Sequence, residues 1–96
     1  MNKIVVLNDR DNVATSLMEL QSAMQIEVPV GAEQLAITVR DNIEFGHKVA
    51  IRPIPSGDEI LKYGEVIGRA STDIEPGDWV HIHNIESVRA RGDVQS

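Results

Sequence analysis

The sequence predicts a mostly β fold with one helix, in the α+β class. Short apolar stretches recur along the chain, Gly and Pro separate them at close intervals, and a single segment near the N-terminus carries apolar residues at helical spacing. With 96 residues and 42% hydrophobic content, the chain can bury one modest core. We therefore expect one domain.

The first predicted elements are a strand and a helix. Residues 3–7, KIVVL, form a β-branched run typical of a buried strand, and the turn-forming residues NDRDN follow it. In the segment 12–24, apolar residues recur at helical spacing: Val13, Leu17, Leu20 and Met24. Asp11 or Asn12 is placed to cap the first turn. This pattern predicts one long helix over 12–24.

Beyond residue 26 the sequence predicts strands separated by turns. Residues 33–40, EQLAITVR, alternate in polarity as a half-buried strand does. One motif, called the recurring phrase below, is then repeated. It reads Ile-x-x-Gly-(His/Asp)-x-(Val/Ile), where x is any residue. Its copies are residues 43–51 (IEFGHKVAI), 54–60 (IPSGDEI) and 74–82 (IEPGDWVHI), with VPVG at 28–31 as a weaker echo. We interpret the phrase as an apolar anchor, a turn closed by a Gly with positive φ, and a strand.

Charge and composition exclude several classes of protein. The formal charge of -6 repels nucleic acid and anionic lipid, so we expect neither as a partner. No apolar run approaches the ~20 residues that span a bilayer, and the N-terminus lacks a signal-peptide pattern, so we expect a cytoplasmic protein. Without cysteine the chain has no disulfide and no thiolate nucleophile or metal ligand.

The stretch 77–84, GDWVHIHN, holds two of the three histidines. If it continues as a strand, His81 and His83 lie on one face, and Val80 and Ile82 point into the core. Two imidazoles on one face could bind a divalent metal ion. The alternative is that both are exposed side chains without a ligand.

The third histidine, His47, stands where Asp occurs in the other copies of the phrase. His47 and three further side chains are candidates for a catalytic or binding role. Lys48, Lys62 and Tyr63 could contact a carboxylate or transfer a proton. The alternatives are that the two lysines are solvated surface charges, that Tyr63 is a surface phenol, and that His47 is simply a turn residue. The sequence contains no phosphate-binding loop, GxGxxG motif or Ser nucleophile elbow.

Four motifs together carry a family resemblance: DNVA (11–14), GHKVAI (46–51), KYGEVIG (62–68) and DIEPGDWVHIHN (73–84). Over nearly its whole length the chain resembles the N-terminal domain, or separate small subunit, of the altronate/galactarate dehydratase family. The resemblance implies an SAF domain with the β-clip fold over 1–88. A polar tail or the start of a linker would follow at 89–96.

The resemblance also implies an activity and a set of site residues. The activity is that of a carbon–oxygen lyase, a hydro-lyase that converts altronate or a related aldonate or aldarate to a 2-keto-3-deoxy acid with a divalent metal, Fe²⁺ or Mn²⁺. Implied catalytic residues are His81, His83, His47 and Lys48, and the implied metal ligands are His81 and His83. Implied substrate-binding residues are Lys62, Tyr63, Asn84, Asp11 and Asn12.

A larger partner is part of this expectation. Relatives carry a much longer dehydratase region after this domain, whereas this chain stops at RARGDVQS, so we expect a separate large subunit or a C-terminal catalytic region. The isolated chain is expected to have no turnover, because ~100 residues supply too few groups to enclose a sugar acid. The alternatives are the small subunit of a sulfolactate sulfo-lyase and a non-catalytic SAF module that binds carbohydrate or protein. A homo-oligomer stays open.

Overall fold

A computed structural model of the protein describes residues 3–87, and every regular element in this range is a β-strand. The strands are β1 (Ile4–Val5), β2 (Val13–Ser16), β3 (Gln25–Val30), β4 (Glu33–Thr38), β5 (Lys48–Ala50), β6 (Glu59–Lys62), β7 (Glu65–Ala70), β8 (Trp79–Val80) and β9 (Ile85–Glu86). All pairs are antiparallel. The described range contains no helix that could cross a membrane. The expected tail, 89–96, lies outside the described residues.

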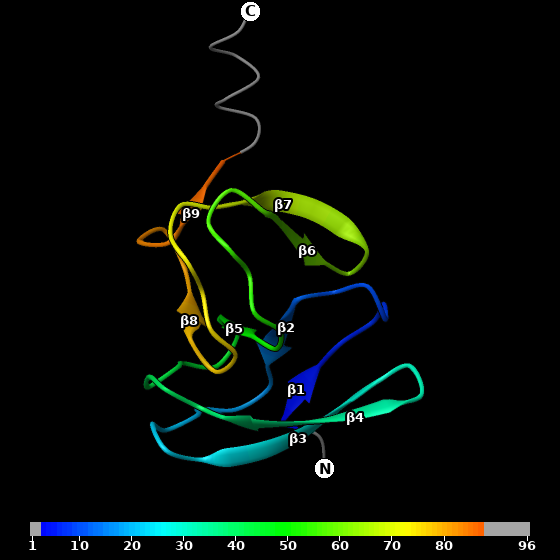
Figure 1. The fold of residues 1–96 in the computed structure, drawn as a ribbon. Helices are drawn as coiled ribbons and strands as arrows, with labels where there is room; N and C mark the ends of the chain where they lie inside the picture. Colours follow the sequence, from blue (N-terminus) through cyan, green and yellow to red (C-terminus); the bar gives the residue numbers. More distant parts are fainter. Residues whose placement is uncertain (1–2, 88–96) are drawn as a thin grey trace, which may run out of the picture.

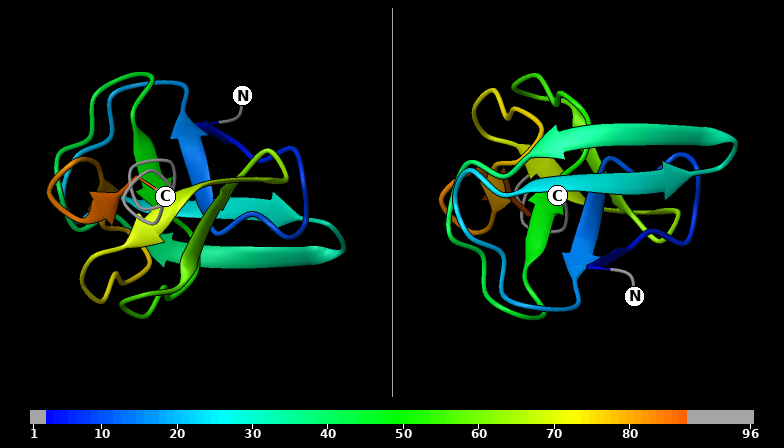
Figure 2. Two further views of the ribbon diagram at one scale, coloured as in Figure 1. Left: turned by 90° about the horizontal axis from the view of Figure 1, so that it is seen from above. Right: turned by 90° about the horizontal axis from the view of Figure 1, so that it is seen from below.

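The strands form three sheets stacked in layers (Figure 1). The central sheet has the order β1-β2-β5-β8, the β3–β4 hairpin covers one of its faces, and the sheet β6-β7-β9 covers the other. Figure 2 shows the hairpin running across β2 and β5 rather than alongside them. Both faces of the central sheet are therefore buried.

Successive residues of the central strands belong to different hydrophobic clusters. In β2, Val13 packs in the cluster under β6 and β7, whereas Ala14 packs in the cluster under the hairpin. In β5, Val49 and Ala50 divide in the same way. Each of these four side chains is fully buried. Alternation between two cores, rather than between core and water, explains why neighbouring residues of these strands are both apolar, as in Val13–Ala14 and Val49–Ala50.

The recurring phrase is confirmed as a repeated turn. Its glycines Gly46, Gly57 and Gly77 have φ values of 85°, 92° and 95°, and β5, β6 and β8 follow them. Each turn is closed by one backbone hydrogen bond of 3.0 Å, from the N–H of the residue after the Gly to the carbonyl of the residue after the anchor Ile. The three bonds join His47 to Glu44, Asp58 to Pro55 and Asp78 to Glu75. The predicted strand at 33–40 is confirmed as β4 and its extension, in which Ile37 and Val39 are buried.

The predicted helix over 12–24 is wrong. Its first part is β2, which pairs with β1 and β5, and its second part is a fourth copy of the turn. Leu20 is the anchor, Ala23 takes the place of Gly with φ 77°, and Met24 donates its N–H to the carbonyl of Gln21 over 3.0 Å. The helical spacing of four apolar residues was a coincidence, because pairing between strands outweighs such local patterns.

Asp11 and Asn12 do not cap a helix either. Their side chains instead bond to the β6–β7 hairpin, on the opposite side of β2 from the β3–β4 hairpin. Both side chains do form hydrogen bonds with backbone groups, as polar residues of this kind are expected to do, but not at the start of a helix. The partner segment lies about fifty residues away along the chain, which the local sequence does not reveal.

Candidate functional site

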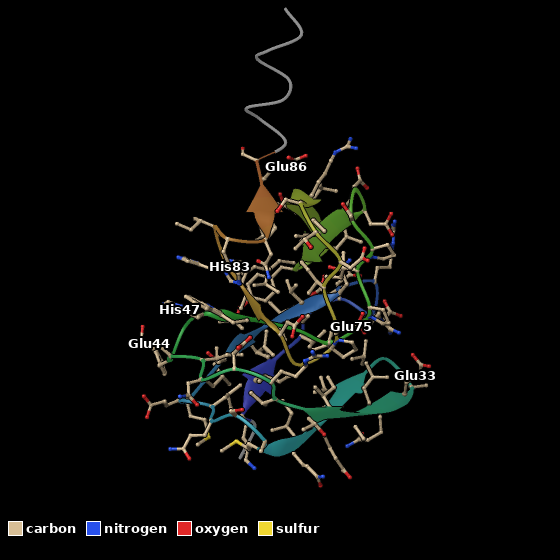
Figure 3. The ribbon with its side chains drawn as sticks, turned by 60° about the vertical axis from the view of Figure 1, so that its left-hand side comes forward. Glu33, Glu44, His47, Glu75, His83 and Glu86 are labelled. Carbon is tan, nitrogen blue, oxygen red and sulfur yellow. The ribbon has the colours of Figure 1, made fainter. Side chains whose placement is uncertain are left out.

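Four aromatic rings gather at one edge of the central sheet: His47, Trp79, His81 and His83. The pairing of β5 with β8, in which Val49 lies opposite Trp79, brings His47 beside the segment that follows β8. The Trp79 ring centroid lies 5.0 Å from those of both His81 and His83. The His47 centroid lies 5.5 Å from that of His81 and 5.9 Å from that of Trp79. All three histidines therefore belong to one cluster, and Figure 3 shows His47 and His83 on the same side of the molecule.

The two histidines of the HxH motif lie in a turn, not on a strand. β8 ends at Val80, and the Asn84 side chain closes the next four residues: its Oδ1 accepts the N–H of His81 over 2.9 Å, and its Nδ2 donates to the carbonyl of Trp79 over 2.9 Å. Ile82, expected in the core, is 83% exposed. The strand prediction for this segment is wrong because a buried Asn competes with the ladder for backbone groups.

A pocket of about 410 Å³ opens beside His81. Its lining includes two lysines, one histidine and three isoleucines: Lys48, Lys62, His81, Ile67, Ile82 and Ile85. The lysines come from β5 and β6, and the isoleucines come from β7, the turn after β8, and β9. Two of the three sheets therefore contribute to one concave surface. His47 and His83 lie outside this lining and contact the rings of Trp79 and His81 instead.

Lys48 is half-buried, and this position shifts its pKa. Burial, and then the charge of neighbouring Lys62, lower the pKa of Lys48 below its usual value of 10.5. Lys62 Nζ also lies 5.1 Å from the centre of the Tyr63 ring, a cation–π contact. The pocket thus holds one lysine with a lowered pKa and a second lysine that lies near an aromatic ring.

Two ring nitrogens at the cluster lack a hydrogen-bond partner. His47 Nδ1 and Trp79 Nε1 are buried, and no described residue bonds to either of them. The indole N–H can only donate, whereas His47 Nδ1 donates or accepts according to its tautomer. On the other side of its ring, His47 Nε2 lies 3.6 Å from Glu44 Oε1. Each unpaired buried group costs roughly 1–3 kcal/mol, so an external partner would stabilise this cluster.

The described residues do not form a complete metal site. Within 3–87, no three His, Asp or Glu side chains are grouped so that they could hold a metal ion. His81 and His83 would supply two ligands at most, whereas a protein metal site usually has three or more. The ligation of Fe²⁺ or Mn²⁺ by these histidines stays a prediction that needs further ligands from outside this range.

Asp11 and Asn12 hold the hairpin that carries Lys62. The fully buried Asp11 carboxylate accepts the backbone N–H groups of Tyr63 over 2.9 Å and Gly64 over 2.8 Å. Both turn residues have positive φ, as in a type I′ turn, which Tyr adopts only at a cost that these bonds offset. Asn12 bonds to the N–H of Leu61 and the carbonyl of Glu59. Substrate contacts by Asp11 and Asn12 stay predictions, and their observed bonds are structural.

Tyr63 and Asn84 also have internal partners. The Tyr63 hydroxyl donates to Thr15 Oγ1 over 2.9 Å, and Thr15 lies opposite Lys48 in the pairing of β2 with β5. Asn84 is 5% exposed and both ends of its amide are bonded. Asn84 therefore positions His81, and Tyr63 borders the surface near Lys48. Direct substrate binding by either residue stays a prediction.

Sequence reasoning missed the apolar side of the pocket. Ile82 was expected in the core and Ile67 was not singled out, yet both side chains are exposed and line the pocket together with the two lysines. The signal for Ile82 was Asn84, a turn-forming residue two positions later. For Ile67 the signal was Gly68, against which the backbone of Glu86 packs so closely that a Cβ would lie 2.7 Å from its carbonyl oxygen. That close approach lets β9 and Ile85 complete the wall.

Comparisons with known proteins place this geometry in a family. A family model described as the altronate/galactarate dehydratase SAF domain matches residues 2–88. An altronate dehydratase from Bacillus subtilis is 36% identical over 87 residues, which are 91% of this chain and 17% of that protein. An altronate dehydratase from Escherichia coli is 38% identical over 74 residues, which are 77% of this chain and 14% of that protein.

A third relative is a subunit rather than a long chain. The (2R)-sulfolactate sulfo-lyase subunit alpha from Paracoccus pantotrophus is 42% identical over 53 residues, which are 55% of this chain and 79% of that subunit. This chain spans less than a fifth of the length of the altronate dehydratases it matches. The family model covers nearly all of the chain, and the resemblance carried by the four sequence motifs is confirmed. This chain belongs to the family of altronate/galactarate dehydratase SAF domains.

Proposed function

We propose that this chain is the SAF-domain part of a hydro-lyase acting on a hydroxy acid such as altronate, and that its pocket forms one side of an active site completed by a larger catalytic region. The observation that carries the proposal is the pocket itself, where Lys48, Lys62 and His81 converge. The family and the greater length of its altronate dehydratase relatives support the need for a second region.

The three polar side chains suit the three demands of dehydration. A proton α to the carboxylate must be removed, and Lys48 Nζ suits this step because its lowered pKa increases its neutral fraction. The enediolate that forms needs a positive charge beside it, which the Lys62 ammonium provides. The departing hydroxide must be protonated, and the His81 imidazolium is a suitable donor when the ligands from the catalytic region, rather than His81, hold the metal.

The catalytic region would supply what the described residues lack. The proposed divalent metal would act as a Lewis acid on the carboxylate, and His81 and His83 could hold it only together with ligands from that region. His47 and His83 would act through the ring cluster that fixes His81. The isolated chain is accordingly proposed to be inactive.

A second candidate is the small subunit of a sulfolactate sulfo-lyase. The specific observation in its favour is that the matched segment makes up 79% of the Paracoccus subunit alpha. Elimination of sulfite also begins with a proton removed next to an acidic group, so the same pocket residues would serve. The two candidates differ in the leaving group and not in the part assigned to this chain.

The test is reconstitution with a lyase large subunit or catalytic region. The chain would be combined with that protein, and formation of 2-keto acid from altronate and galactarate, and release of sulfite from sulfolactate, would be measured. We expect turnover of one substrate class by the combination and none by either component alone. Full activity of the large component without this chain would refute the shared site and favour a non-catalytic binding module.

A further inference from the structure

Two lysine side chains, Lys48 and Lys62, line the pocket, and no described residue forms an ion pair with either of them. The chain has fifteen acidic residues against nine basic ones, yet the described residues that line the pocket include no Asp or Glu. An anion beside the two lysines would accept a charge-assisted hydrogen bond from the Lys62 ammonium and a further hydrogen bond from the Lys48 amine, which donates an N–H in its neutral form as well.

Three isoleucines form an apolar wall of the pocket. They are Ile67, Ile82 and Ile85, whose side chains have no hydrogen-bonding atom; Ser87, which also lines the pocket, carries one hydroxyl. A hydroxyl group pressed against this wall would lose its bonds to water without replacement. A carbon chain would lose nothing there. The pocket therefore offers more favourable contacts to a charged head group and its first carbons than to a polyhydroxylated tail.

We propose that the pocket is an anion subsite that binds the carboxylate head group of a hydroxy acid and leaves the hydroxyl-bearing tail to be recognised outside this chain. The inference deepens the proposed function and rests on it for the identity of the substrate. It implies that this chain does not discriminate among hydroxy acids that differ only in their tails. Discrimination between altronate, galactarate and sulfolactate would lie in the catalytic region.

Direct binding to the full chain tests the subsite without requiring turnover. ¹H–¹⁵N NMR spectra would be recorded during titration with glycolate, which has a short tail, with gluconate, which has a long one, and with sorbitol, which has no carboxylate. We expect both carboxylates to shift the amide signals of Lys48, Lys62 and Ile82 with Kd values within about threefold of each other. We expect no such shifts with sorbitol.

Variants locate the site and probe its wall. Lys62→Met should weaken binding of both carboxylates at least about tenfold, because one charge-assisted bond is lost, whereas the exposed Lys3→Met is the matched control and should change nothing. Ile82→Asn adds an amide to the wall and should favour gluconate over glycolate. The dispersion of each spectrum reports whether the variant is folded.

Four outcomes would overturn the inference: no shifts with glycolate up to about 100 mM, sorbitol binding as well as gluconate, gluconate binding far more tightly than glycolate, or unaltered binding in Lys62→Met. A failure of the proposed function looks different. Carboxylates would then bind as described while the reconstituted protein forms no 2-keto acid. Conversely, an active complex whose KM is unchanged by Lys62→Met would retain the function and remove the subsite.

Discussion

Replacing Gly77 by Ala tests the packing of the turn that precedes β8 and the candidate site. Its φ of 95° costs an L residue about 1–2 kcal/mol, and a Cβ built there would lie 2.0 Å from the carbonyl oxygen of Thr38, closer than any real contact. Relief of that clash must separate the turn from the end of β4. The separation strains the 2.9 Å bond from the Arg40 N–H to the Gly77 carbonyl, at about 1 kcal/mol for a lost hydrogen bond.

Gly57→Ala is the matched control, because Gly57 has a φ of 92° in the same turn but nothing within 4 Å of an added Cβ. We expect a loss of about 1 kcal/mol for Gly57→Ala and about 3 kcal/mol for Gly77→Ala, since only the latter adds the clash. Urea unfolding followed by the fluorescence of Trp79, the single tryptophan, measures both. Equal losses in the two variants would refute the close approach of the turn to β4.

Three further predictions concern buried polar groups. Asp11→Asn places a donor against the two N–H groups of the 63–64 turn and should cost about 1–3 kcal/mol in urea unfolding; an unchanged midpoint would contradict the carboxylate's structural role. Asn84→Ala removes both bonds that close the turn at His81 and should shift the imidazole NMR signal of His81; an unaltered signal would contradict its positioning role. The third prediction concerns Lys48, whose pKa is lowered by burial and then by a neighbouring lysine. Between that lowered pKa and 10.5, the folded chain binds fewer protons than the unfolded chain. The free energy of unfolding therefore rises with pH across this window. Lys48→Met should therefore be more stable than the wild type at pH 7 by a margin that narrows toward pH 10.5, and a constant margin would contradict the lowered pKa.

The glycine turns could be predicted from sequence because their cause is local. A Gly between an apolar anchor and a strand carries its conformational requirement in the residue itself, and three copies reinforced one another. The fourth copy of the turn was not recognised because Ala23 occupies the Gly position. The apolar residues of this segment were therefore assigned to a helix. Helical spacing over one segment is weak information when long-range pairing with β1 and β5 decides the structure.

The candidate site was predicted in its residue types but not in its geometry. Lys48 and Lys62 were both named as candidates, but their meeting in one pocket depends on the packing of β6 over the central sheet, which the sequence does not reveal. His47 joins the other histidines through the pairing of β5 with β8, thirty residues further along the chain. The apolar wall was unforeseen because the turn closed by Asn84 turns Ile82 outward. Contacts of this range depend on the whole fold, and a local motif does not contain them.

The central claim is that Lys48 and its pocket belong to an active site that this chain shares with a catalytic region. The most direct measurement is kcat of the reconstituted lyase with Lys48→Met, beside the exposed Lys3→Met as control. The account predicts a loss of at least about 10²-fold in kcat for Lys48→Met, as for removal of a general base, with complex formation retained and the control unchanged. A kcat equal to that of the wild type in a fully assembled Lys48→Met complex would contradict it.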